Sequence, residues 1–210
     1  MDEVDNKWKV FLEQEDKIEY QIYCDMDGVL VDLEEGIERE LISLKNNGQL
    51  EENVMIQAIQ VLNSGEVWED LQRNSELKAG AQAIFDILNN PSEEERERFW
   101  TYLPRKNDMN MLWSYIKEYN PTILTAPWRL PSGRLDTACM QGKRNWVGRF
   151  NLDPREVIVT PDKYKYANRN HILIDDMDRY IEPWKSAGGI PIKHFSSDKT
   201  IPQLKDLLEK

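Results

Sequence analysis

Residues 22–32 read IYCDMDGVLVD, and within them an apolar run ends at two aspartates spaced by one residue. A short run that is rich in apolar and β-branched residues and bounded by polar ones is typical of a buried strand. Gly28 follows the two acids and lets the backbone turn where a Cβ would hinder it. The pattern therefore predicts a strand over residues 20–24 whose carboxyl end presents Asp25 and Asp27.

Four further runs of the same kind lie later in the chain. They are residues 122–125 (TILT), 157–160 (VIVT), 171–174 (HILI) and 190–194 (IPIKH). Apolar residues at helical spacing lie between these runs, as in the stripe from Met109 to Ile116, which follows the candidate N-cap Asp108. Alternating strands and helices favour a parallel sheet with helices on both faces, so the predicted class is α/β.

The region between residues 33 and 106 contains no clear strand and shows helical spacing of its apolar residues. Asp32 and Glu35 are placed like a capping box, and Gly48 would stop the helix that they begin. The charged run EEERER, which follows Ser92, is expected to be a solvated helix face. We therefore expect a helical insertion at residues 33–106 within a core formed by residues 1–32 and 107–210.

Composition and charge exclude several classes of function. The 210 residues, of which 40% are hydrophobic, suit one ordinary core with an insertion. The formal net charge of −11 disfavours binding to long nucleic acid, because that binding rests on Lys and Arg contacts with phosphates. Cys24 and Cys139 are too few for a disulfide framework. No apolar run reaches the ~20 residues of a membrane span, and the N-terminus has no apolar signal core, so a cytoplasmic protein is expected.

Polar residues follow the predicted strands at the edge where ligands of parallel sheets bind. They are Asp25, Asp27, Thr125, Lys163, Asp175 and Asp176. At a separation of ~4 Å and an effective dielectric constant of ~20, each carboxylate pair repels by ~4 kcal/mol, so a proton or a cation must relieve the strain. Carboxylate oxygens suit a hard divalent ion, and Mg²⁺ binds one or two of them together with waters and substrate phosphate.

The same residue types suggest phosphoryl chemistry. Of Asp25 and Asp27, one carboxylate can attack phosphorus as a nucleophile and form an aspartyl-phosphate. Its neighbour can protonate the leaving oxygen and then activate water. Lys163 supplies positive charge and Thr125 supplies a hydrogen-bond donor for a phosphoryl group.

Four segments, in order, resemble the motifs of the haloacid dehalogenase (HAD) superfamily of phosphatases. DMDGVLVD resembles the first motif, ILT ending at Thr125 the second, PDK with Lys163 the third, and ILIDD with Asp175 and Asp176 the fourth. The resemblance implies a Rossmann-like core with a small helical cap. It also implies Mg²⁺ as cofactor and hydrolysis of a phosphomonoester.

The resemblance also implies roles for the acids. Asp25 is similar to the nucleophile of the family, and Asp27 to its general acid and base. Mg²⁺ would be held by Asp25, the main-chain carbonyl of Asp27 and Asp176, with Asp175 beside it.

On the substrate side, the resemblance implies that Thr125 and Lys163 bind the phosphoryl oxygens, and Ala126, next to Thr125, is a candidate for the same site. Lys165 is the alternative to Lys163, because the chain between Lys163 and the fourth motif is two residues longer than in the branch described below. Four basic residues are candidates for an anion pocket near a helix start or are simply solvated, and the first is the best of them: Lys143, Arg129, Arg134 and Arg144.

Within the superfamily, the segments T-x-P at residues 125–127 and K-x-x-W-V at residues 143–147 resemble the 5′(3′)-deoxyribonucleotidase-like branch. The implied substrate is a nucleoside monophosphate. Leu33 and Ala126 depart from that branch, which has Phe and Ser there. The alternatives are a HAD phosphatase for another small phosphate ester and a non-catalytic module that binds Mg²⁺ or a phosphorylated ligand. The oligomeric state is open, and a homodimer is one form that the sequence allows.

The remaining histidines and aromatic residues are interpreted as structural. His171 and His194 lie in or beside predicted strands, and the mechanism needs neither. Phe99, Trp100 and Tyr102 end the insertion and are expected to pack in the core or at a hinge, with stacking on a substrate ring as the alternative.

Overall fold

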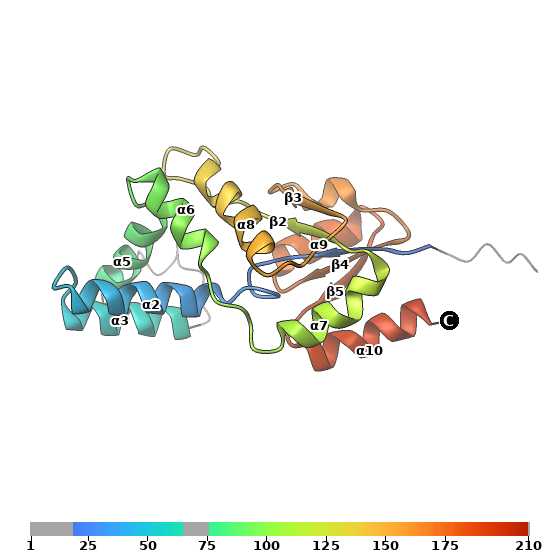
Figure 1. The fold of residues 1–210 in the computed structure, drawn as a ribbon, viewed down its shortest axis with the longest axis horizontal. Coiled ribbons are helices and arrows are strands. Elements are labelled where there is room, and N and C mark those ends of the chain that lie inside the picture. The colour runs from blue at the N-terminus through green and yellow to red at the C-terminus, as the bar shows by residue number, and fades with distance from the viewer. Residues whose placement is uncertain (1–18, 65–75, 210) are drawn as a thin grey trace, which may run out of the picture.

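The computed structural model describes residues 19–64 and 76–209. Within them, five parallel strands form one sheet in the order β3-β2-β1-β4-β5 (Figure 1). The strands are β1 (Gln21–Cys24), β2 (Thr122–Thr125), β3 (Glu156–Val159), β4 (His171–Asp175) and β5 (Ile190–Lys193). The predicted α/β class is confirmed, and each predicted strand lies within one residue of an observed one.

Strand register brings the carboxyl ends of the two central strands level. Cys24 at the end of β1 lies opposite Ile174 in β4. The next residue, Asp25, donates its backbone N–H to the carbonyl of Ile174 at 2.9 Å. The side chain of Asp25 therefore emerges beside Asp175, the last residue of β4.

Helices cover both faces of the sheet. They are α7 (Met109–Ile116), α8 (Thr137–Arg149), α9 (Asp178–Ser186) and α10 (Ser197–Leu208), with 3₁₀ turns η1 (Lys117–Tyr119) and η2 (Lys163–Tyr166). On one face, Ile22 and Ile174 belong to the large core cluster that includes residues of α7, α8 and α10. On the other face, Tyr23 and Leu173 pack with Trp184 of α9. Side chains of alternate strand residues thus pack on opposite faces of the sheet, as expected of a sheet buried on both sides.

A group of helices lies between β1 and β2 in the chain and beside the sheet in space (Figure 1). Its described members are α2 (Leu33–Asn46), α3 (Glu52–Asn63), α5 (Lys78–Leu88) and α6 (Glu93–Thr101). Asp32 caps α2, as predicted, by accepting from the backbone N–H of Glu35 at 3.1 Å. The two connections to the core run side by side, since Lys106 donates its N–H to the Leu30 carbonyl at 2.9 Å. The proposed domain boundaries at residues 33 and 106 stay predictions.

Helix α6 packs closely against α8 of the core. A Cβ on Gly142 would lie 2.5 Å from the Cβ of Trp100 and 2.7 Å from the carbonyl oxygen of Glu97, which is closer than real contacts allow. Asn145 also donates to the Glu97 carboxylate at 2.9 Å. The glycine therefore permits the two helices to approach, and the last helix of the insertion is held on the core.

The expectation of a solvated EEERER run is wrong at Arg96, which is only 5% exposed. Its Nε lies 3.0 Å from Oδ2 of Asp136 and its Nη2 lies 3.3 Å from Oδ1, while Nη1 donates to the carbonyl of Asn90. Asp136 also caps α8 by accepting from the N–H of Ala138 at 3.1 Å. Arg96 is buried because α6 packs on α8 and its guanidinium meets the capping carboxylate there.

Asp108 also differs from expectation, because its side chain does not cap α7. The carboxylate instead accepts the backbone N–H of Ser197 at 2.6 Å and so joins the start of α7 to the start of α10. The structural interpretation of the histidines fits their contacts. His194 is buried with its Nδ1 2.9 Å from the Thr200 hydroxyl, and His171 Nδ1 lies 2.6 Å from the Tyr166 carbonyl oxygen.

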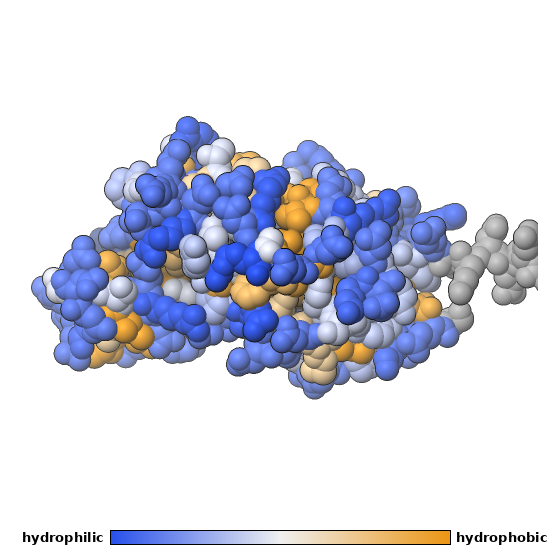
Figure 2. Space-filling view, in the orientation of Figure 1, coloured by the Kyte–Doolittle hydropathy of each residue, from blue (hydrophilic) through white to orange (hydrophobic). Residues whose placement is uncertain are grey.

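The face of the molecule in Figure 2 is mostly hydrophilic, with apolar residues in small groups. Among the described helices, none has both the length and the apolar composition needed to cross a bilayer. Among the described residues, the large apolar side chains that are exposed are spread over several elements: Ile42, Ile56, Tyr102, Met111, Tyr164, Tyr166, Met177 and Phe195.

Candidate active site

Three carboxylates meet at the carboxyl ends of β1 and β4. Asp25 directly follows β1, Asp175 ends β4, and Asp176 comes next. Each offers an oxygen atom, and these atoms all lie within 4.8 Å of one another. Asp25 and Asp175 are buried. The structure thus brings Asp25 of the first motif together with both acids of the fourth motif, which is far away in the sequence.

Lys163 lies between two of these acids. Its Nζ is 2.8 Å from Oδ2 of Asp25 and 2.6 Å from Oδ2 of Asp175. Burial alone would lower the pKa of Lys163, but the two carboxylates raise it above its ordinary value, so the ammonium stays charged. The alternative, Lys165, has an exposed side chain that pairs with Asp162 at 2.6 Å. Of the two candidate lysines, the structure places Lys163 in the cluster.

A second buried lysine, Lys143, pairs with Asp27, the other aspartate of the first motif. Lys143 of α8 donates from Nζ to Oδ2 of Asp27 at 2.5 Å, to the hydroxyl of Thr125 at 2.9 Å and to the carbonyl of Ala126 at 2.6 Å. An ammonium has three N–H donors, so these three acceptors account for all of them. Burial tends to lower the pKa of Lys143, and Asp27 outweighs this and raises it. Lys143 therefore ties α8 to the tips of β1 and β2. Trp100 covers it, with the ring centroid 5.2 Å from Nζ.

The acids of the fourth motif titrate near neutrality. Burial, followed by the charge of Asp25, raises the pKa of Asp175 to about 7, although Lys163 acts in the opposite direction. Burial, Asp25 and Asp175 raise the pKa of Asp176 to about 7 as well. Below neutral pH, Asp175 and Asp176 therefore hold protons that a cation would displace.

The residues of the cluster fit a magnesium ion. Among the described residues, Oδ1 of Asp176 and Oδ1 of Asp27 are buried without a hydrogen-bond partner, and such an oxygen is costly unless something positive meets it. All three clustered donors are carboxylates, which Mg²⁺ prefers. Gly28, at φ +75°, leaves room for Asp176, whose Oδ2 would lie 2.2 Å from a Cβ placed there. The side chain of Asp27 lies with Lys143, outside the group of three, and its carbonyl as a metal ligand stays a prediction.

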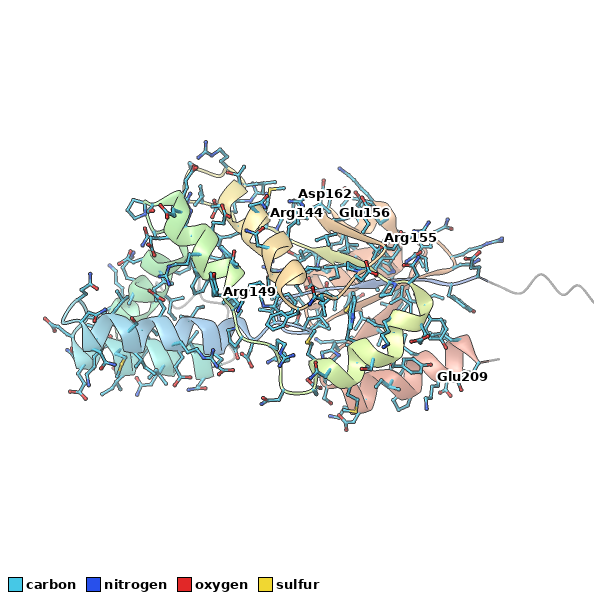
Figure 3. All side chains as sticks on the ribbon, in the orientation of Figure 1. Arg144, Arg149, Arg155, Glu156, Asp162 and Glu209 are labelled. Atoms are coloured by element: carbon cyan, nitrogen blue, oxygen red, sulfur yellow. The ribbon has the colours of Figure 1, made fainter. Side chains whose placement is uncertain are left out.

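The candidate arginines lie on exposed segments. Arg129 donates to the Gly133 carbonyl at 2.6 Å, and Arg144 on α8 donates to the Met140 carbonyl at 3.3 Å (Figure 3). Arg134 is exposed too. These contacts within their own segments fit a role in solvation better than one in an anion pocket.

Comparisons with known proteins agree with this fold. Neither a family model nor a curated protein matches the sequence. Solved structures do match: a HAD-superfamily hydrolase of subfamily IA from Geobacter sulfurreducens has 12% identity and a TM-score of 0.54, covering 93% of this chain and 99% of that one. YfnB from Bacillus subtilis, described as a HAD hydrolase bound to magnesium, has 14% identity and a TM-score of 0.53, covering 91% and 100%. A hydrolase from Streptococcus pneumoniae has 15% identity and a TM-score of 0.52, also covering 91% and 100%.

At such identities the likeness establishes the architecture. The chain has the fold of HAD-superfamily hydrolases, with the acidic cluster at the carboxyl edge of its sheet.

Proposed function

We propose that this protein is a Mg²⁺-dependent phosphomonoester hydrolase that works through an aspartyl-phosphate on Asp25. The observation that carries the proposal is the position of the Asp25 carboxylate at a strand end, 2.8 Å from Lys163 and with an oxygen within 4.8 Å of those of the fourth-motif acids. The fold, shared with hydrolases, supports it. Asp25, Asp175 and Asp176 would hold the ion, which when bound would neutralise charge on the phosphoryl oxygens.

The first step uses Asp25 as nucleophile. Its Oδ1 accepts the backbone N–H of Met26 at 2.7 Å and its Oδ2 faces Lys163, so the carboxylate is held in place. A carboxylate oxygen forms a bond to phosphorus while the bond from phosphorus to the ester oxygen breaks. Asp27 gives a proton to the departing alcohol, and Lys163 with Thr125 balances charge on the phosphoryl group.

The second step releases phosphate. Asp27 takes a proton from water, whose oxygen bonds to phosphorus as the bond from phosphorus to Asp25 breaks. Inorganic phosphate leaves and both carboxylates return to their starting state. Lys143, which donates to Asp27 and to Thr125, keeps these two side chains at the reacting edge of the sheet.

The substrate that we propose is a nucleoside monophosphate. This rests on the T-x-P and K-x-x-W-V segments and on the helical group beside the site. Another small phosphate ester is the alternative within the same chemistry. A non-catalytic Mg²⁺-binding module is the alternative outside it, and such a module would have no need for Asp27 beside Asp25. The cytoplasmic location and the homodimer stay predictions.

Phosphate release from ribo- and deoxynucleoside monophosphates, sugar phosphates and an aryl phosphate, each with Mg²⁺ and with EDTA, tests the proposal. We expect release that requires Mg²⁺ and that Asp25→Asn abolishes while the circular dichroism spectrum is kept. Absence of Mg²⁺-dependent release across the panel would favour the binding module.

A matched pair of lysine variants tests the assignment of Lys163. Lys163→Met should remove turnover, because it takes the cation from Asp25. Lys165→Met should keep wild-type turnover, because that side chain is on the surface. The reverse ranking would transfer the phosphate-binding role to Lys165.

A further inference from the structure

The Lys163 ammonium has a third neighbour besides its two carboxylates. Its Nζ lies 4.2 Å from the centroid of the Tyr180 ring, within the range in which a cation is attracted to an aromatic face. Lys163 is only 1% exposed, so bulk water does not reach the ammonium. Two of its N–H groups are directed to Asp25 and Asp175, and the aromatic face meets the remaining side.

The Tyr180 ring is held in place by its own surroundings. Tyr180 lies in the first turn of α9, where its N–H donates to the Met177 carbonyl at 3.0 Å. The ring packs against the cluster of Tyr23, Leu124, Leu173 and Trp184 on the α9 face of the sheet. The guanidinium carbon of Arg179 is 5.0 Å from the same ring, so the ring meets a second cation besides Lys163.

We propose that Tyr180 is a positioning residue that holds the Lys163 ammonium between Asp25 and Asp175 through its aromatic face. A lysine side chain has four rotatable bonds and presents a compact charge that is free to turn toward other acids. Asp176 is one such acid, since its oxygen lies within 4.8 Å of those of Asp25 and Asp175. The ring closes the open side of the ammonium and keeps its N–H groups aimed at the nucleophile.

The role of the ring in catalysis rests on the proposed function, whereas the contact itself does not. If Lys163 stabilises the phosphoryl group during transfer, a displaced ammonium slows the chemical step more than it weakens substrate binding. The proposed contact is made by the aromatic face of Tyr180 and not by its hydroxyl. Tyr180→Phe should therefore behave as wild type and Tyr180→Leu should not.

The first test needs no turnover. In metal-free protein carrying ¹³C-labelled lysine, the ε-CH₂ signal of Lys163, assigned by its loss in Lys163→Met, should be shifted upfield by the ring. Tyr180→Phe should keep that shift and Tyr180→Leu should remove it. Tyr164→Leu, which changes an exposed tyrosine of η2, is the matched control and should leave it unchanged. A Lys163 signal that is the same in wild type and Tyr180→Leu overturns the proposal.

The second test is kinetic. Tyr180→Leu should lower kcat by about tenfold with KM changed less than about twofold, and Tyr180→Phe should restore wild-type kcat. If kcat falls equally in Tyr180→Phe and Tyr180→Leu, the effect belongs to the hydroxyl and the proposal is wrong. The proposal is also wrong if Tyr180→Leu keeps the wild-type kcat. If the wild-type protein has no turnover, the proposed function is wrong, but the inference about Tyr180 is still tested by the NMR signal of Lys163.

Discussion

Lys143 and Asp27 are 116 positions apart in the sequence, and their side chains meet at 2.5 Å between Nζ and Oδ2. Asp25, two residues before Asp27, has a different lysine, Lys163, at 2.8 Å. The two aspartates of one short motif therefore form ion pairs with separate buried lysines, one from α8 and one from η2. This separation fits the two roles that we propose for the acids.

Replacement of Lys143 by Met should lower kcat by about 100-fold, because Asp27 and Thr125 lose the donor that orients them. Steady-state hydrolysis of an aryl phosphate with Mg²⁺ measures this. Lys185→Met, on the exposed side of α9, is the control and should match wild type. A Lys143→Met enzyme with normal kcat and raised KM would show that Lys143 binds substrate instead of positioning the acid.

Mg²⁺ should raise the melting temperature of the protein, and more so at pH 8 than at pH 6. The pKa of Asp175 and of Asp176 is about 7 in the metal-free fold, above the value of about 3.9 for an unfolded aspartate. Protonation of these two acids therefore contributes fully to the free energy of unfolding below about pH 4, and this contribution is lost as the pH rises through 7. Above pH 7 the carboxylates are ionised and free to bind Mg²⁺. Thermal unfolding with and without Mg²⁺ measures the difference.

Asp176→Asn is the matching variant for that measurement. It removes one anionic ligand of the cluster, so most of the shift caused by Mg²⁺ should disappear. Asp162→Asn, at a side chain paired on the surface with Lys165, should keep the shift. Equal Mg²⁺ shifts in the wild type and in Asp176→Asn would place the ion elsewhere.

Arg96→Met should destabilise the fold by about 3–5 kcal/mol, because it leaves the Asp136 carboxylate buried without its partner. Urea unfolding followed by tryptophan fluorescence measures the free energy. Arg39→Met is the control: its pair with Glu35 is exposed, and its loss should cost about 0.3–0.5 kcal/mol. A loss in Arg96→Met as small as that of the control would contradict the structural role of the buried pair.

Between pH 7 and pH 5, His194 should oppose the gain in stability that protonation of Asp175 and Asp176 brings. Burial lowers the pKa of His194, outweighing Asp108, which raises it, while Lys106 lowers it further. The unfolded chain therefore takes up this proton at a higher pH than the folded chain, so the contribution of His194 to the free energy of unfolding decreases as the pH falls. In denaturant unfolding, the free energy at pH 5 minus that at pH 7 should be more positive in His194→Asn, whose amide can still reach Thr200, than in the wild type. An identical difference in both proteins would exclude this role of His194.

The arrangement of the strands was predictable because its signals are local. TILT is a short β-branched run, and the observed strand β2 has the same bounds as the prediction. Asp32 was recognisable as a helix cap because a capping bond joins residues three apart. The carboxyl edge then gathers its acids by topology alone, since parallel strands end on the same side.

Contacts between distant segments could not be predicted in this way. The burial of Arg96 depends on how α6 meets α8, and in the sequence it is one charge within a charged run. The cap that Asp108 provides for Ser197 joins residues 89 positions apart, so no local rule detects it. Lys143 was a candidate for an anion pocket near a helix start, but its three acceptors come from the tips of β1 and β2 and appear only when the helix is placed.

The close contact at Gly142 sets a rule for exchanging parts between proteins of this architecture. A chimaera joined at residue 106 would take α6 from one protein and α8 from another. If the α8 of the second protein carried Ala at position 142, its Cβ would clash with Trp100 of α6. A junction between Asn90 and Ser92 would keep α6 and α8 from the same protein, so that their contact at Gly142 is preserved. The part of the insertion suited to transplantation is therefore shorter than its helical sequence suggests.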